Sequence, residues 1–237
     1  MYHVEDRHWW YRGMASITRA LLDRRVSLPP NPKILDAGCG TGAAMTTYLA
    51  EHGQVSGVDL YPQALEFCRK RNARRLARAS VLDLPFASAS FDLVTSFDVL
   101  YERAVPSDIT ALREFFRILL PGGFVLLRLP AYDWLRGQHD TLVHTHRRYT
   151  KKRVKELLEQ GGFSVLHLSY ANALLFPLAV IKRLGERMFP AKEAQSDLAL
   201  DVGIFNDLLV RILACEAPFV AHAGLPYGLS VFAIGRK

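Results

Sequence analysis

The sequence has few of the features that mark a secreted, disulfide-linked or membrane-spanning protein. Its three cysteines are far apart and form no Cys-x-x-Cys pair, so we expect reduced thiols and no structural metal site. Residues 171–181, the longest apolar run, are too few to cross a bilayer. Residues 1–12 are too rich in charged side chains for a secretory signal. Internal repeats and low-complexity segments are also absent. Together these absences predict a cytoplasmic protein.

What the chain does contain is hydrophobic residues and positive charge. Half of its 237 residues are hydrophobic, which predicts a large core and excludes disorder. The net charge is +7, and basic residues concentrate in residues 69–78 and 147–155. Such clusters can bind the phosphates of nucleic acid or of lipid head groups. They are also typical of the solvated faces of helices, which is the interpretation we favour.

Residues 1–32 are expected to form a helical cap before the core. Apolar side chains recur every three or four residues from Trp10 to Leu21, which predicts a helix over residues 7–25. The prolines of residues 29–32 end it. The aromatic start of this helix either packs against a sheet or faces a substrate, through Trp10, Tyr11 and Arg12.

Residues 33–170 alternate between strand and helix patterns. We predict strands over residues 33–37, 54–59, 78–82, 91–96, 124–129 and 163–170, and a last strand over residues 227–236. Helices are expected over residues 43–52, 62–71, 108–119 and 151–160. Strands alternating with helices predict an α/β fold, Rossmann-like and doubly wound, with residues 33–170 as the ligand-binding core and residues 227–237 as its final strand.

Residues 171–226 are too many for a hairpin between the last two strands. Their apolar stripes predict two helices, at residues 172–189 and 203–216, with Pro177 kinking the first or marking its start. This insert is expected to be a lid over a substrate pocket, a surface for a membrane or a partner, or a packed subdomain. Lys182, Arg183 and Arg187 lie beside the stripe of residues 172–189, as basic residues do in an interfacial helix, so peripheral membrane contact through this stretch stays one of the open alternatives.

A glycine-rich turn follows the first predicted strand. Gly38, Gly40 and Gly42 permit a tight turn of bare backbone, at the strand end where α/β folds bind nucleotide-like ligands. The stretch satisfies the loose form of the dinucleotide fingerprint. Asp36, however, puts a carboxylate where a pyrophosphate would lie, which suits a ligand with an ammonium or a sulfonium instead.

Five ordered segments resemble the motifs of the class I S-adenosylmethionine-dependent methyltransferases, of the small-molecule, type 11 kind. Residues 35–42 (LDAGCGTG) look like the first motif, and Asp59 matches the acidic residue that binds the ribose hydroxyls. Residues 80–86 (SVLDLPF), 91–94 (FDLV) and 117–123 (RILLPGG) look like the later motifs. The resemblance implies S-adenosylmethionine as cofactor. It also implies a seven-stranded sheet of order 3-2-1-4-5-7-6 whose last strand is antiparallel.

The resemblance further implies cofactor-binding roles at the turn and the strand ends. The glycines would let the backbone approach the methionine part, with Cys39 as a spacer between them. The residues expected to hold the cofactor are Asp36, Gly38, Cys39, Gly40 and Gly42, then Asp59 and Leu60 at the ribose, Asp83 and Leu84 at the adenine, and Ser96 and Phe97 beside the sulfonium.

A general base is needed only if the nucleophile arrives protonated, as a phenol or an alcohol does. One candidate is Glu102, in a Tyr101-Glu102 pair that stands where many relatives carry Glu-His. The others are His144 and His146, in the long loop of residues 130–149. No matched carboxylate pair accompanies these histidines, so no metal is expected. The residues expected to contact substrate here are Tyr101, Arg147 and Tyr149, unless the last two only dock the loop.

The acceptor is expected to be a small, apolar molecule methylated on oxygen. Residues 96–99 (SFDV) lack the (Asp/Asn/Ser)-Pro-Pro-(Tyr/Phe) motif of enzymes that methylate nucleic-acid amines. No cysteine stands there for C5-pyrimidine chemistry, so nucleic acid is disfavoured. Two alternatives stay open: a membrane- or partner-associated enzyme with a lipid-like substrate, and a non-catalytic scaffold that binds the cofactor. The sequence leaves the oligomeric state open.

Overall fold

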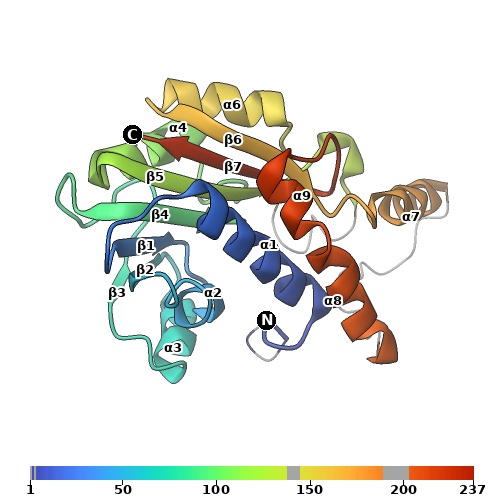
Figure 1. The fold of residues 1–237 in the computed structure, drawn as a ribbon, viewed down its shortest axis with the longest axis horizontal. Helices are drawn as coiled ribbons and strands as arrows, with labels where there is room; N and C mark the ends of the chain where they lie inside the picture. The colour runs from blue at the N-terminus through green and yellow to red at the C-terminus, as the bar shows by residue number, and fades with distance from the viewer. Residues whose placement is uncertain (1, 3, 138–144, 189–202) are drawn as a thin grey trace.

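The computed structural model describes residue 2 and residues 4–137, 145–188 and 203–237. A single seven-stranded sheet runs through it (Figure 1). The strands are β1 (Lys33–Ala37), β2 (Gln54–Asp59), β3 (Leu76–Arg78), β4 (Phe91–Phe97), β5 (Leu119–Pro130), β6 (Ser164–Ala171) and β7 (Ser230–Arg236). Their order is β3-β2-β1-β4-β5-β7-β6, and β7 is antiparallel to both of its neighbours. The predicted fold class and strand order are confirmed.

Helices cover both faces of the sheet because its central strands are apolar on both faces. Ile34 and Leu35 are adjacent in β1 and both fully buried, yet they belong to two different hydrophobic clusters. Leu35 packs in the cluster that includes α4 (Asp108–Ile118) and α6 (Lys151–Gln160). Ile34 packs in the cluster that includes α1 (Trp9–Arg25), α8 (Asn206–Ala214) and α9 (Ala217–His222).

Two elements near the glycine turn differ from the sequence prediction. The helix expected over residues 43–52 is only α2 (Ala43–Thr46). The threonines at its end bond back to the backbone: Thr46 Oγ1 donates to Gly42 O at 2.7 Å and Thr47 Oγ1 donates to Ala43 O at 2.6 Å. The third strand ends at Arg78 rather than at residue 82. After it the chain turns tightly, with Asp83 N donating to Ser80 O at 3.1 Å.

The insert between β6 and β7 is helical, as predicted, but divided differently. Its first helix, α7 (Phe176–Met188), has Pro177 in its first turn, where a missing N–H costs no hydrogen bond, so Pro177 marks the start of the helix. The second predicted helix becomes a short 3₁₀ turn (Gly203–Phe205), α8 and α9, with Pro218 in the first turn of α9. No helix in the described part of the chain is both long and apolar enough to span a membrane.

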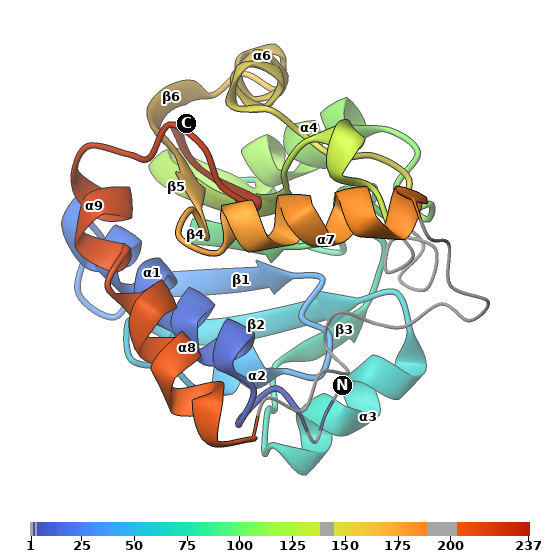
Figure 2. The ribbon, with the colours of Figure 1, turned by 90° about the vertical axis from the view of Figure 1, so that its right-hand side faces the viewer.

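The insert contacts two different parts of the molecule. Helices α8 and α9 pack against α1, and the three lie side by side in both ribbon views (Figures 1 and 2). Gly13 allows α1 to come close to α8, since a Cβ at this position would lie 2.6 Å from Leu213 Cδ2. Helix α7 lies apart from this layer, at the far right of Figure 1, and its Phe176 packs against Tyr132 and Trp134 in the segment that follows β5.

Candidate active site

A cavity of about 1300 Å³ opens at the carboxyl edge of β1, β2 and β4. Its lining comes from residues 5–6, α1, the glycine turn, the ends of β2, β4 and β5, α7 and α8. Ligands of open α/β sheets bind at this edge, in the crevice where the strand order reverses. The volume exceeds the range of about 300–1000 Å³ usual for a single small ligand, so it has room for two molecules together.

The glycine turn forms one wall of the cavity. Gly38 and Gly40 have φ values of +84° and +54°, which favour glycine. A Cβ on Gly38 would lie 2.2 Å from Val99 Cγ2, so no side chain fits there. A Cβ on Gly40 would meet no atom within 4 Å, because this glycine faces the open cavity. The bare backbone at Gly40 therefore leaves space that a ligand can fill.

Asp59 ends β2 beside this turn with its carboxylate held in a fixed orientation. Gly40 N donates to Asp59 Oδ2 and Tyr61 N donates to Asp59 Oδ1, each at 2.9 Å. The side chain is buried, and desolvation raises the pKa of the carboxyl. Each carboxylate oxygen keeps a further acceptor site. The group can therefore accept hydrogen bonds from two adjacent hydroxyls, as a ribose presents them.

Asp36 lies deeper, at the end of β1. It is 2 % exposed, and its Oδ1 accepts a hydrogen bond from Thr95 Oγ1 at 3.0 Å. Burial raises the pKa of Asp36 to about 7. A cationic ligand group in the cavity would stabilise the ionised form of this carboxyl.

Arg128 is a cavity residue that the sequence analysis missed. Its guanidinium lies between the rings of Trp10 and Phe97, 4.8 and 5.1 Å from their centroids, and pairs with Asp98 at 2.7 Å. Asp98 N also donates to Arg128 O at 2.9 Å. The available signal was a lone arginine in the apolar run of residues 124–129, because a charge buried in a strand requires a partner.

The segment before α1 closes over the glycine turn. Glu5 is 8 % exposed and accepts a hydrogen bond from Thr41 Oγ1. Arg71 joins this segment from the end of α3 (Pro62–Lys70), 3.7 Å from Glu5 and 2.8 Å from Asp6. The N-terminal segment is thus tied by ion pairs to the side of the cavity that holds Asp59.

The structure brings most of the predicted site residues into this one cavity. Those that line it are Asp36, Gly38, Cys39, Gly40, Asp59, Leu60 and Phe97 of the expected cofactor set, Trp10, Tyr11, Arg12 and Tyr101 of the expected substrate set, and Glu102. Burial raises the pKa of Glu102 to about 7, with smaller contributions from the negative charges of Asp59 and Asp98.

Four residues of the expected cofactor set do not line the cavity. Gly42 packs against Cys68, where a Cβ would come within 2.9 Å of Sγ. Ser96 is fully buried in β4. Asp83 is exposed beyond the turn that follows β3, and Leu84 beside it is buried, with its N–H donating to Glu114 Oε2 at 2.9 Å. The residues that line the cavity after β3 are Ala79, Ser80 and Val81.

The long loop contributes differently from the prediction. His146 is exposed and lies outside the cavity lining, and His144 is outside the described residues. Arg147 donates from Nη2 to Leu100 O at 3.2 Å and lies 3.3 Å from Asp108. The Tyr149 hydroxyl donates to Asp108 Oδ1 at 3.0 Å, and its ring is buried. Arg147 and Tyr149 thus dock the loop onto the start of α4.

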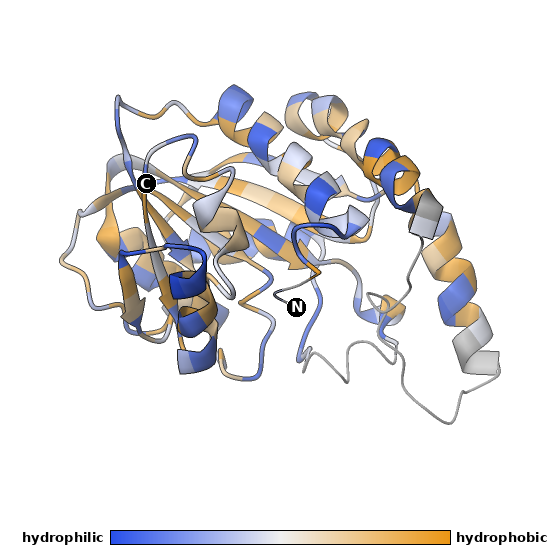
Figure 3. Cartoon of the chain, turned by 90° about the horizontal axis from the view of Figure 1, so that it is seen from below, coloured by the Kyte–Doolittle hydropathy of each residue, from blue (hydrophilic) through white to orange (hydrophobic). Residues whose placement is uncertain are grey.

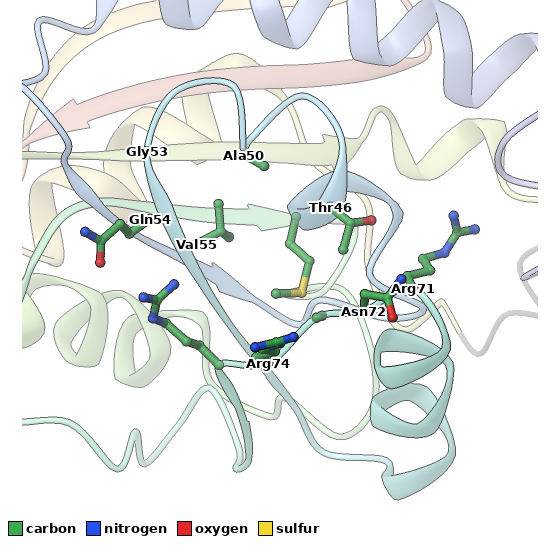
Figure 4. A pocket seen from close by; sticks show the side chains of 11 residues that line it. Thr46, Ala50, Gly53, Gln54, Val55, Arg71, Asn72 and Arg74 are labelled. Atoms are coloured by element: carbon green, nitrogen blue, oxygen red, sulfur yellow. The ribbon is translucent and has the colours of Figure 1, made fainter.

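A second, smaller cavity of about 420 Å³ lies between the chain that precedes β2 and the α3–β3 connection (Figure 4). Gln54, Arg71 and Arg74 are among its lining residues. None of the predicted site residues lines this cavity.

Comparison with known proteins agrees with this geometry. Residues 35–127 match the family described as methyltransferase domain. A demethylmenaquinone methyltransferase of Staphylococcus aureus (strain MRSA252) is 37 % identical over 101 residues, which are 40 % of this chain and 41 % of the relative. A second, from strain Newman, matches over the same length with the same identity. This chain therefore aligns with about two fifths of the length of these curated relatives.

Solved structures extend the likeness to the whole fold. One solved structure is the complex of the Haloferax volcanii Trm112 methyltransferase activator with a methyltransferase. One chain of that complex superposes on this protein with a TM-score of 0.61 at 19 % identity, and the alignment covers 99 % of this chain and 92 % of the other. An S-adenosylmethionine-dependent methyltransferase of Thermotoga maritima has a TM-score of 0.60 at 15 % identity, and the alignment covers 100 % of this chain and 92 % of the Thermotoga chain. Residues 35–127 therefore resemble a methyltransferase domain, and the chain as a whole shares the fold of these solved methyltransferase structures.

Proposed function

We propose that this protein transfers a methyl group from S-adenosylmethionine to an oxygen of a small, largely apolar acceptor. The observation that carries the proposal is one continuous cavity that joins the Gly40–Asp59 wall to apolar residues of α1, α7 and α8. A cofactor and an acceptor can lie in contact there without crossing solvent. Bound S-adenosylmethionine supplies an electrophilic methyl on a sulfonium, and the chain has only to align the acceptor with it.

Four cavity residues lie where they could bind the cofactor or act on the acceptor. Gly40 leaves room for the methionine part of the cofactor, and Asp59 accepts from the ribose hydroxyls. Asp36 lies where a buried carboxylate can face the positive charge of the donor. Glu102 is the base that takes the proton of an alcohol or phenol, since a pKa of about 7 leaves much of it ionised near neutral pH.

The cofactor part is tested by removing the charge of Asp59. Asp59→Asn should weaken S-adenosylhomocysteine binding by roughly 100-fold, since hydrogen bonds to charged groups contribute about 1.5–3 kcal/mol each. Isothermal titration calorimetry measures the affinity, and circular dichroism checks the fold. The matched control is Asp23→Asn, which removes an exposed carboxylate at the far end of α1, outside the cavity lining, and should leave the affinity unchanged. Undiminished affinity in Asp59→Asn, or an equal loss in both variants, would contradict the proposal.

A turnover screen separates the enzyme from a non-catalytic scaffold. Cofactor consumption is followed with alcohols, phenols and amines, and with a reduced naphthoquinone because the curated relatives are named for demethylmenaquinone. We expect turnover with an apolar hydroxyl compound and its loss in Glu102→Gln. Tight cofactor binding with no turnover on any acceptor would favour the scaffold.

A second candidate, a membrane-associated methyltransferase with a lipid-like substrate, is favoured by the surface of the insert. Leu178 and Ile181 of α7 and Leu208 of α8 are 64, 66 and 52 % exposed. Hydrophobic segments appear along α7, at the far right of Figure 3. Lys182 stands beside them, and an apolar stripe with basic neighbours suits an anionic membrane surface.

Co-sedimentation with vesicles tests this candidate. The protein should pellet with phosphatidylcholine vesicles that contain phosphatidylglycerol, and Leu178→Ser with Ile181→Ser should abolish this. Leu166→Ser is the control, because Leu166 is 45 % exposed but stands in β6, outside the insert. Failure to bind vesicles with or without phosphatidylglycerol removes this candidate.

A further inference from the structure

The wall of the large cavity contains a buried amide that makes no hydrogen bond. Among the described residues, six buried side-chain atoms lack a hydrogen-bond partner, and Asn172 Oδ1 is the one whose residue lines this cavity. Asn172 follows β6 and is 2 % exposed. A buried polar atom without a partner costs free energy, because it has lost the water that would satisfy it. A ligand that bonds to this amide would offset the cost.

The turn at this position does not by itself account for an asparagine. Asn172 has a φ of +61°, which is in the left-handed region. Glycine adopts this conformation more easily, although asparagine tolerates it. Glycine would therefore make the turn from β6 toward α7 at least as well, and it would leave no amide to bury. The amide at this position points to a role beyond the turn.

A second polar residue lies beside Asn172 on the neighbouring strand. Ser230 begins β7 and pairs with Ala171, the residue before Asn172. Ser230 is 5 % exposed and also lines the large cavity. Leu175 and Leu229, which are close to these residues in the sequence, are part of the same lining. The end of β6 and the start of β7 thus place two uncharged polar side chains beside apolar ones.

These two side chains have the chemistry to bind a neutral ligand group. The amide of Asn172 has donors and an acceptor, and the hydroxyl of Ser230 can both donate and accept. The last torsion of an asparagine side chain is soft, so either atom of the amide can turn toward a ligand. Since neither side chain is charged, a hydroxyl or a carbonyl matches them better than an ion does.

The Asn172 position is far from the proposed base. Glu102, in the connection that follows β4, lines the same cavity. Strands β4, β5 and β6 all end at one edge of the sheet, because β7 is antiparallel to both of its neighbours. The order β4-β5-β7-β6 puts the ends of β4 and β6 three inter-strand steps apart. At the usual strand spacing this separation is about 14 Å. A molecule that reaches both places must be elongated.

We propose that Asn172 binds a second, neutral polar group of the acceptor, a hydroxyl or a carbonyl at the far end of an elongated apolar molecule. The reacting hydroxyl lies at Glu102, and the far group hydrogen-bonds to Asn172 beside Ser230. Asn172 is then a specificity-determining residue, which selects among acceptors and takes no part in methyl transfer itself. This assignment rests on the proposed function and specifies its substrate class.

Simple alcohols test the assignment without knowledge of the natural acceptor. The full chain, saturated with S-adenosylhomocysteine, is titrated with decane-1,10-diol and with decan-1-ol, which lacks the second hydroxyl. Decan-1-ol is the more apolar of the two, so it should bind tighter in a purely apolar pocket. We expect the reverse, with the diol binding about threefold tighter or better, because its far hydroxyl meets a buried partner. Equal or tighter binding of decan-1-ol overturns the proposal.

A shorter pair of alcohols tests the distance. Butane-1,4-diol should have no such advantage over butan-1-ol, because its chain is too short to reach Asn172 from Glu102. An advantage as large as that of the longer diol would show that the second hydroxyl binds elsewhere, and would overturn the proposal.

Asn172→Gly connects the preference to this side chain. Glycine accepts the φ of the position, so the variant removes the amide without straining the turn. It should bind decan-1-ol as well as the wild-type chain does, but lose the preference for the diol. Asn31→Gly is the matched control, because Asn31 also has a positive φ, of +53°, but is exposed and lies outside the cavity lining.

Three results for the variants would contradict the proposal. They are an unchanged preference in Asn172→Gly, an equal loss of preference in both variants, and a loss of binding to both alcohols in Asn172→Gly, which would give Asn172 a structural role instead. S-adenosylhomocysteine affinity, measured separately, reports on the proposed function. Its absence in the wild-type chain defeats that function, whereas its retention without a preference for the diol defeats only the assignment of Asn172.

Discussion

Glu102 combines burial with a position in the cavity that holds Asp59 and Tyr101. Its pKa is raised to about 7, first by desolvation and then by two neighbouring carboxylates. A general base acts in its ionised form, and that fraction grows as pH rises through the pKa. The rate of methyl transfer should therefore increase between pH 6 and pH 8.

Glu102→Gln should remove this rise and reduce kcat by about 10²–10⁴-fold, the usual contribution of a general base. The measurement is a pH–rate profile with a hydroxyl acceptor that does not itself ionise in this range. Glu66→Gln, on the exposed side of α3, should keep the wild-type profile. A variant at position 102 that retains both the rate and its pH dependence would assign the base elsewhere.

At individual positions, sequence reasoning succeeded where the motif itself sets the geometry. Gly40 and Asp59 were predicted because a bare turn and a carboxylate at the next strand end lie close together in any parallel α/β sheet. Asp83 lies outside the cavity lining because β3 ends four residues earlier than expected and a tight turn follows it, and its role at the adenine stays a prediction. Arg128 was missed because only packing reveals that two rings and Asp98 enclose it.

Helices α1 and α8 provide a prediction about packing. Gly13 sits where any Cβ would lie 2.6 Å from Leu213, whereas Gly185 of α7 has no atom within 4 Å of its Cβ position. Glycine to alanine in an open helix position usually stabilises by roughly 0.5–1 kcal/mol. Gly13→Ala should instead destabilise by about 1–3 kcal/mol, the usual cost of overpacking.

Urea unfolding of the two variants measures this difference. Gly185→Ala, in the same class of secondary structure, should show an equal or higher midpoint than the wild-type chain, and Gly13→Ala a lower one. If both variants shift in the same direction, α1 and α8 do not meet as closely as these positions indicate.

The bounds of helices were predicted well where a hydrophobic periodicity or a proline defined them. The stripe from Trp10 to Leu21 fixed α1 to within two residues of its observed start, and Pro177 marked the start of α7. The shortness of α2 was not predictable from its apolar pattern, because threonine hydroxyls that bond to Gly42 O and Ala43 O end it. The exposure of Ile181 and Leu184 on α7 could not be predicted either, since an apolar stripe does not say whether its side of the helix is buried.

The stability of the whole molecule depends on pH through Asp36 and Glu102, because burial raises the pKa values of both carboxyl groups to about 7. Between the ordinary carboxyl pKa near 4 and this value, the folded chain holds protons that the unfolded chain has released. Raising the pH through this window therefore favours unfolding, so these groups lower stability as pH increases.

Asp36→Asn tests this dependence on cofactor-free protein. The change in urea midpoint between pH 5.5 and pH 8 should be smaller in the variant than in the wild-type chain, because one titrating group is gone. Thr95 can still donate to the amide oxygen, so the local hydrogen bond survives. An identical pH dependence in both proteins would show that Asp36 does not titrate in this window.

The position of β7 also bears on how the chain reaches its native state during synthesis. Strands β5 and β6 do not pair with each other, because β7 lies between them and bonds to both. A ribosome that has completed β6 must still make the whole insert and residues 230–236 before this half of the sheet can close. Until then two apolar strand edges remain open to other chains, which makes the growing polypeptide a natural client for chaperones.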